Sequence, residues 1–287
     1  MNIWRPLLSH GWLQLLVVYL LLGLIAWQQV SADMLISPIR VYLDDDNRST
    51  EVTLRNPSDG PRSYRLEWVE KSMQENGQYK TYSEDEPLPY KPASSLLRFA
   101  PRQITVGPEE NQTVRVIFRP KNDTQPGEYH SHLLFKVIPE LSEPVDTVNM
   151  ESEEGIQMEL NMQLSLSVPV VVRHAVDEPP KVRISQVKPV QNKRSEQSAQ
   201  LAVTLERQGL AGSYGQLVVE MQRDQQANVE RIGLVDNLSI FPEIERREVK
   251  VVLRDRNIPP GAWLRVAYEG EQEYRDIVWD EKIFQIR

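Results

Sequence analysis

Apolar and polar residues alternate with a period of two over much of this chain, and the longest such run covers residues 156–172. Side chains of a β-strand point to alternate faces, so the run predicts a single, very long amphipathic strand. An ordinary strand has about 5–6 residues, and this one would be about three times as long. One sandwich core would cover about half of the apolar stripe, leaving the rest exposed or paired with another chain. The stripe consists of Ile156, Met158, Leu160, Met162, Leu164, Leu166, Val168, Val170 and Val172.

Shorter alternating segments precede this strand and are separated by turn residues such as the run from Asn56 to Gly60. No helical period of any length interrupts them. Seven segments in about 140 residues predict an all-β sandwich. The six segments before the long strand are residues 35–43, 51–54, 64–69, 102–106, 113–118 and 129–138.

A second set of alternating segments follows Asp177-Glu178-Pro179-Pro180, whose prolines stiffen the chain and predict an interdomain hinge. We therefore expect two β-sandwich domains, residues 33–176 and 177–287. Between residues 139 and 155 the chain is acidic and poor in large apolar side chains, which predicts a mobile loop, or else an ordinary long surface loop. The segments of the second domain are residues 182–187, 201–205, 217–221, 249–253 and 264–268.

The first 32 residues are typical of a secretory signal peptide, with Arg5, an apolar run over residues 12–27 and Val30-Ser31-Ala32 before Asp33. A retained membrane anchor is the alternative, but the apolar run is shorter than the ~20 residues that span a bilayer. Cleavage would leave an exported protein of 255 residues without stable membrane insertion. Because the chain contains no cysteine, its domains would depend on core burial rather than on disulfides.

The net charge of −8 would become −9 after cleavage, since only Arg5 is lost, and nucleic acid is therefore an unfavourable partner. His130 and His132 share one strand face at a spacing that can bind a metal, but no third ligand is evident, so we expect solvent-facing histidines and no metal. Enzymatic motifs are absent, and Gly212-Ser213-Tyr214-Gly215 is not a nucleophile elbow. The sequence predicts neither catalysis nor a cofactor.

The order of several motifs resembles the periplasmic chaperones that assemble pili and fimbriae through the chaperone–usher pathway (PapD-like). The resemblance covers nearly the whole chain after the signal. The matching fragments are Ile36-Ser37-Pro38-Ile39-Arg40-Val41-Tyr42-Leu43, Asn56-Pro57, Phe99-Ala100-Pro101-Arg102, Val114-Arg115-Val116-Ile117, Pro126-Gly127-Glu128-Tyr129, Leu134-Phe135-Lys136-Val137-Ile138-Pro139 and Val170-Val171-Val172-Arg173.

The resemblance implies two immunoglobulin-like sandwiches in a boomerang arrangement. In that family the last strand of the first domain is lent to a pilus or fimbrial subunit that lacks its own final strand, a form of β-augmentation. The lent side chains correspond here to Leu160, Met162, Leu164 and Leu166, and Met158 extends the contact. The expected partners are such subunits and an outer-membrane usher, and the expected compartment is the periplasm.

The resemblance also implies residue roles at the domain junction. Family members bind the subunit's terminal carboxylate with two basic residues, and Arg40 matches the first of them. The second position falls on Pro169, so either another base such as Arg173 substitutes or the subunit is anchored differently. Glu128 and Arg173 match an interdomain ion pair that fixes the domain angle. Rival hypotheses are an exported adhesion or carbohydrate-binding protein with the same sandwiches, and a periplasmic hydrolase, for which no residues are found.

Overall fold

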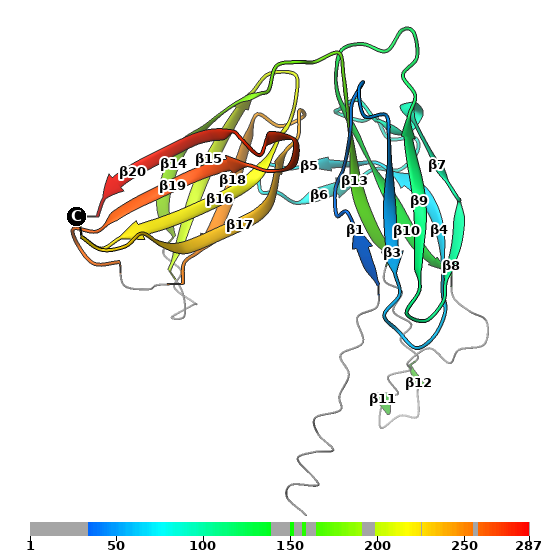
Figure 1. The fold of residues 1–287 in the computed structure, drawn as a ribbon, viewed down its shortest axis with the longest axis horizontal. Helices are drawn as coiled ribbons and strands as arrows, with labels where there is room; N and C mark the ends of the chain where they lie inside the picture. Colours follow the sequence, from blue (N-terminus) through cyan, green and yellow to red (C-terminus); the bar gives the residue numbers. More distant parts are fainter. Residues whose placement is uncertain are drawn as a thin grey trace, which may run out of the picture.

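A computed structural model of the protein describes residues 34–138, 150–151, 157–158, 165–190, 199–224, 226–254 and 258–286. Most of these residues lie in strands, and among them there are two 3-10 helices, η1 (Ser94–Leu96) and η2 (Gln272–Tyr274), and no α-helix. The predicted all-β fold class is confirmed. Figure 1 shows two β-sandwiches set at an angle, like the arms of a boomerang. The predicted signal peptide lies outside the described residues.

The first sandwich consists of a four-stranded sheet in the order β1-β3-β9-β7 and a five-stranded sheet in the order β2-β13-β10-β4-β8. All neighbours are antiparallel except β2 and β13, which are parallel. Two small ladders accompany them, β5 with β6 and β11 with β12. The strands are β1 (Leu35–Ser37), β2 (Val41–Leu43), β3 (Ser49–Arg55), β4 (Arg62–Val69), β5 (Lys71–Met73), β6 (Tyr79–Thr81), β7 (Leu97–Ala100), β8 (Gln103–Val106), β9 (Asn111–Phe118), β10 (Gly127–Ile138), β11 (Met150–Glu151), β12 (Gln157–Met158) and β13 (Leu166–His174).

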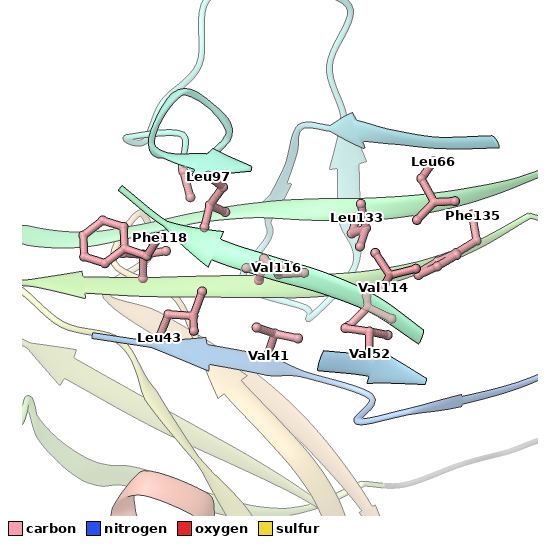
Figure 2. Packing of buried hydrophobic residues seen from close by; sticks show 14 of the residues in the cluster. Val41, Leu43, Val52, Leu66, Leu97, Val114, Val116, Phe118, Leu133 and Phe135 are labelled. Carbon is pink, nitrogen blue, oxygen red and sulfur yellow. The ribbon is translucent and has the colours of Figure 1, made fainter. Parts of the chain in front are cut away.

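The alternation of each strand explains the core between these two sheets. On β9, Val114, Val116 and Phe118 are buried, whereas Arg115 between them is exposed. Figure 2 shows these side chains meeting Leu133 and other apolar residues of the facing sheet. Burying a side chain of this size contributes roughly 1.5–3 kcal/mol, which lets a domain without disulfides fold by core burial.

The first predicted segment, residues 35–43, is divided between the two sheets. Its first part, β1, pairs with β3 in the four-stranded sheet, and its second part, β2, pairs with β13 in the five-stranded sheet. Pro38, which has no N–H for a ladder, and Ile39 lie between the two strands. Arg40 immediately precedes β2, whose first residue, Val41, pairs with Val170 of β13.

The predicted long strand is described only in part. Its C-terminal part is β13, but Gln157–Met158 forms β12 and pairs with Met150–Glu151. The expectation of a loop over residues 139–155 was therefore wrong for Met150–Glu151, which form β11, while the continuity of the long strand stays a prediction. Residues 159–164 lie outside the described part of the chain.

The second sandwich has a three-stranded sheet, β14-β15-β18, facing a four-stranded sheet, β17-β16-β19-β20. Its core includes Leu205, Leu217, Val251, Val266 and Tyr268. Sequence periodicity missed β17 and β20: β17 contains bulges that shift its register with β16, and β20 is an edge strand rich in charged residues. The predicted division after residue 176 falls between β13 and β14. The strands are β14 (Lys181–Val190), β15 (Gln200–Gln208), β16 (Ser213–Gln222), β17 (Glu230–Ile240), β18 (Arg246–Val252), β19 (Trp263–Gly270) and β20 (Val278–Gln285).

Candidate functional site: the edge of β13 and the domain junction

Strand β13 is paired along its whole length on one side only. On that side it pairs with β10 from Leu166 to His174. On the other side β2 pairs only with Val170–Val172, and no strand in the described ranges pairs with residues 166–169. The backbone there presents an open strand edge, the kind of surface to which an extended chain adds by main-chain hydrogen bonds.

The apolar stripe of the sequence divides at this edge. Val168, Val170 and Val172 are buried in the first sandwich, and Leu166 is half-buried. The next three predicted donor residues, Leu160, Met162 and Leu164, lie outside the described residues. Met158 belongs to β12, where its backbone pairs with Met150. The core of the first sandwich thus covers the C-terminal part of the stripe, and the donor assignments stay a prediction.

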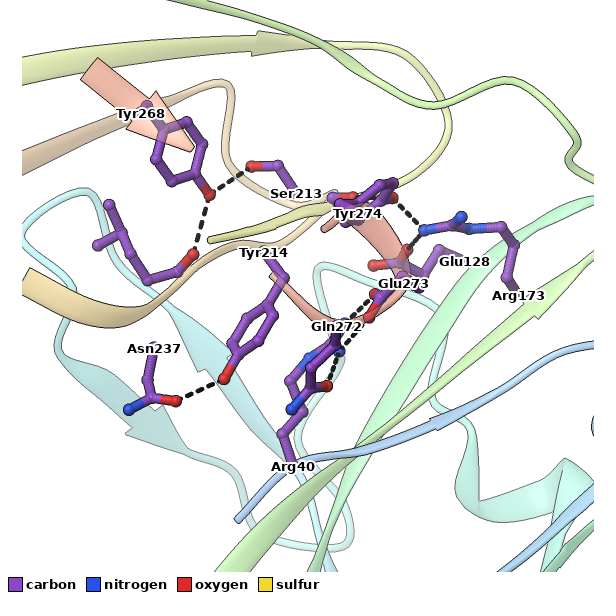
Figure 3. A network of polar contacts seen from close by, with 12 residues as sticks. Arg40, Glu128, Arg173, Ser213, Tyr214, Asn237, Tyr268, Gln272, Glu273 and Tyr274 are labelled. Carbon is purple, nitrogen blue, oxygen red and sulfur yellow. Dashed lines mark hydrogen bonds and ion pairs between the residues drawn. The ribbon is translucent and has the colours of Figure 1, made fainter. Parts of the chain in front are cut away.

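Arg40 is buried at the junction between the sandwiches. Its Nη1 donates to Glu273 Oε2 at 2.9 Å and to Gln272 Oε1 at 3.0 Å, and its Nη2 donates to Glu273 Oε1 at 2.7 Å. The guanidinium also lies over the ring of Tyr214, 4.3 Å from its centroid. All three partners belong to the second sandwich, as Figure 3 shows. Sequence reasoning identified Arg40 but not these partners, because no short motif marks them.

Glu128 and Arg173, on the adjacent strands β10 and β13, form an ion pair at 3.1 Å. The Nη2 of Arg173 also donates to the hydroxyl of Tyr274, in η2. Burial alone would lower the pKa of Arg173, but Tyr274 and Glu128 outweigh it and raise the pKa. Both members of the pair thus belong to the first sandwich, and Tyr274 connects them to the second. Their predicted role in fixing the domain angle remains a prediction.

A second contact between the sandwiches forms around His130. Its ring stacks on Tyr90 and on Phe241, with centroids 4.1 Å and 4.3 Å away, and its Nε2 lies 3.1 Å from Glu243 Oε2. His132 is buried too. The expectation that both histidines face solvent was wrong, because the second sandwich and the β5–β6 hairpin cover this face of β10.

Lys71 of β5 lies beside the open edge, where its Nζ donates to Ser167 Oγ at 2.7 Å. Partial burial lowers the pKa of Lys71. This lysine reaches β13 two residues before Pro169, the position at which the family resemblance predicts a base. Sequence reasoning could not find it, since Lys71 and Ser167 are far apart in the chain.

Within the described ranges, no group of three or more histidine, aspartate or glutamate side chains is arranged to hold a metal ion. No helix among the same residues has the length and apolar character needed to cross a membrane.

No protein-family model and no curated protein matches this chain. Solved structures similar to it include the CupB2 chaperone of Pseudomonas aeruginosa, with 11% identity, 88% of this chain and 100% of that chain covered, and a TM-score of 0.43. The E. coli chaperone DraB has 12% identity, coverage of 88% and 97%, and a TM-score of 0.41. The periplasmic chaperone SfaE has 12% identity, coverage of 87% and 98%, and a TM-score of 0.43. All three are chaperones, the class that the sequence resembles, but similarity at this level assigns no function or residue role.

Proposed function

We propose that this protein is a periplasmic chaperone that captures pilus or fimbrial subunits by lending them a strand and delivers them to an outer-membrane usher. The observation that carries the proposal is the open edge of β13 at residues 166–169, together with the apolar stripe that continues before it in the sequence. A stripe longer than one sandwich can bury has a clear use if a second, incomplete sandwich covers the remainder.

Strand donation would work by two kinds of contact. Main-chain groups of the lent segment would pair with the open edges of the subunit, which gives affinity without sequence specificity. Alternate side chains, from Met158 to Leu166, would fill the groove left by the missing strand. Each buried side chain contributes roughly 1.5–3 kcal/mol before the cost of ordering the segment. No nucleotide is needed, since exchange for a better-packed strand can itself release free energy.

Arg40 would bind the carboxyl terminus of the subunit, because a guanidinium holds a carboxylate with two parallel hydrogen bonds. The bidentate contact with Glu273 supports this role, as it demonstrates the same geometry with a carboxylate of the chain itself. Glu128 and Arg173 would hold the junction in which this contact is made.

The test is subunit capture by a variant in which Leu160, Met162 and Leu164 are all replaced by Ser. We expect co-expression pull-down to lose the small β-rich subunit that the wild type retains, since three groove-filling side chains are removed. Thermal stability should change little if these residues serve the subunit rather than the chaperone's own core.

The matched control replaces Asn161 and Gln163 by Ser, which alters the same segment on its polar positions. This control should capture the subunit as the wild type does. Retained capture by the triple variant would mean that the donor segment is assigned wrongly, and a wild type recovered only as free monomer beside its candidate subunits would contradict the chaperone function.

The carbohydrate-binding alternative receives less support. A hollow of about 550 Å³ in the second sandwich is lined mostly by polar side chains, by Ile277 and Val278, and by one aromatic residue, Tyr214. The ring of Tyr214 is already covered by the guanidinium of Arg40. Sugar sites commonly use an open aromatic face, which this hollow does not offer.

A further inference from the structure

The two terminal nitrogens of the Arg40 guanidinium are occupied by side chains of the chain itself. Both terminal nitrogens donate to Glu273, and Nη1 also donates to Gln272. The two charged side chains are only 5% and 11% exposed. The remaining nitrogen, Nε, is buried and has no hydrogen-bond partner among the described residues. A ligand carboxylate therefore finds no accessible pair of N–H groups on Arg40 as the structure stands.

Arg40 and Arg173 are each paired with one carboxylate. Two cations, Arg40 and Arg173, lie with two carboxylates, Glu128 and Glu273, as Figure 3 shows. A third carboxylate would compete with Glu273 for the same terminal nitrogens of Arg40, and a buried carboxylate left without a partner is strongly unfavourable. An incoming carboxylate would thus have to replace one of the two, and Glu273 is the one that occupies Arg40.

The turn that carries Glu273 has room to move away. Gln272, the first residue of η2, has φ of +53°, a left-handed conformation that is unfavourable for a residue with a side chain. The 550 Å³ hollow of the second sandwich lies beside this turn and is lined by Gln272 and by the cation Arg275. Release of Glu273 from Arg40 would free η2 to shift towards this space.

We propose that Glu273 is a resident carboxylate that closes the Arg40 site in the free protein, and that the carboxyl terminus of a bound subunit displaces it. This inference rests on the proposed chaperone function. Free carboxylates in solution would not compete with an intramolecular one, whereas a carboxylate held close by strand pairing at β13 acts at high effective concentration. Glu273 thus makes the site selective for ligands that also engage the β13 edge, and it couples capture to the contacts between the sandwiches.

The experiment measures binding of a peptide with the carboxyl-terminal residues of the captured subunit, made once as the free acid and once as the amide. Glu273→Gln keeps the size of the side chain but weakens its hold on Arg40. We expect this variant to bind the acid at least about tenfold more tightly than the wild type, and both proteins to bind the amide equally.

The matched control is Glu271→Gln, which removes the same charge from the residue just before η2. Glu271 accepts a hydrogen bond from the backbone of Asn237 rather than from Arg40. This variant should bind the acid as the wild type does. In the double variant Arg40→Ala/Glu273→Gln, the gain should vanish, since the cation that receives the carboxylate is absent.

Equal or weaker binding of the acid by Glu273→Gln, in a protein whose wild type captures the subunit, would overturn the inference while leaving the chaperone function standing. A wild type that captures no subunit would overturn both. If Glu273→Gln does not fold, as judged by its thermal transition, Glu273→Asp replaces it. The shorter side chain cannot keep both hydrogen bonds, so tighter binding of the acid is again expected, and unchanged binding again overturns the inference.

Discussion

His130 and His132 lie two residues apart on β10. The sequence predicted that both would face solvent, but both are buried in the fold. Alternation places them on the face opposite the core of the first sandwich, which the sequence predicted to be exposed to solvent. Phe241 and Glu243 of the second sandwich contact His130 there, and Tyr79 of the β5–β6 hairpin contacts His132. The surroundings of these two side chains are therefore set by residues that are distant in the chain.

Burial has a measurable consequence for His132. It lowers the pKa of His132 to about 3, with smaller contributions from His130 and Lys71. Below the unfolded-state pKa of about 6.5, the unfolded chain binds a proton that the folded protein does not. The contribution of His132 to the free energy of unfolding is thus fully present above about pH 6.5. It falls by up to about 1.4 kcal/mol per pH unit as the pH drops towards 3.

We predict that His132→Phe, measured by urea denaturation between pH 7 and pH 4, loses less stability on acidification than the wild type. Phenylalanine retains the ring beside Tyr79, which contacts His132 edge-on. Parallel curves for the two proteins would show that His132 is protonated in the folded state as readily as in the unfolded one.

The β5–β6 hairpin extends from the first sandwich to the second. Glu248 N of β18 donates to Glu75 O of the hairpin at 2.7 Å, and Met73 N donates to Glu243 Oε1 at 2.9 Å. Figure 1 shows the hairpin lying between the two arms. Period-two patterns did not predict it, because its strands have three residues each, too few for a pattern.

The turn of this hairpin offers a test with an internal control. Gly77 has φ of +81°, and a Cβ there would lie 2.8 Å from Nη2 of Arg247 in the second sandwich. Gly261 has φ of +90°, and a Cβ there would meet nothing within 4 Å. Both alanine variants should lose about 1–2 kcal/mol of stability from the backbone alone.

We predict that Gly77→Ala loses more stability than Gly261→Ala in urea denaturation, by about 0.5–1 kcal/mol, because Arg247 must also move. Equal losses would indicate that the contact between the hairpin turn and Arg247 contributes nothing to stability.

At the scale of the whole molecule, the contacts between the two sandwiches in the described part of the chain fall into two groups. One joins η2 to Arg40 and Arg173, and the other joins Glu243 to His130 and to the hairpin. Buried polar groups that are paired across an interface are costly to separate. We therefore expect the two sandwiches to unfold together.

Glu243→Ala should break this cooperation, since it leaves Met73 N and His130 without their acceptor. We predict one calorimetric transition for the wild type and two for this variant, with the lower transition several degrees below that of the wild type. Glu245→Ala removes an exposed carboxylate from the same loop and should behave as the wild type does. A single unshifted transition for Glu243→Ala would show that this contact does not couple the sandwiches.

The site residues of the first sandwich could be predicted from the sequence around them. Their partners in the second sandwich could not. Arg40, Glu128 and Arg173 could be named because they lie in short sequence fragments that resemble those of periplasmic chaperones. Glu273 and Gln272 lie in a short 3-10 turn that has no periodic signal, and their importance comes only from contact with Arg40 across the junction.

The sequence by itself determined the all-β fold, most of the longer strands and the apolar stripe, because alternation with a period of two is a local property of a strand in a half-buried sheet. Only the tertiary structure decided that β1 and β2 enter different sheets, that the edge of β13 is open at residues 166–169, and that Glu273 occupies Arg40. These depend on which distant segments meet, and no local pattern of residues encodes such contacts.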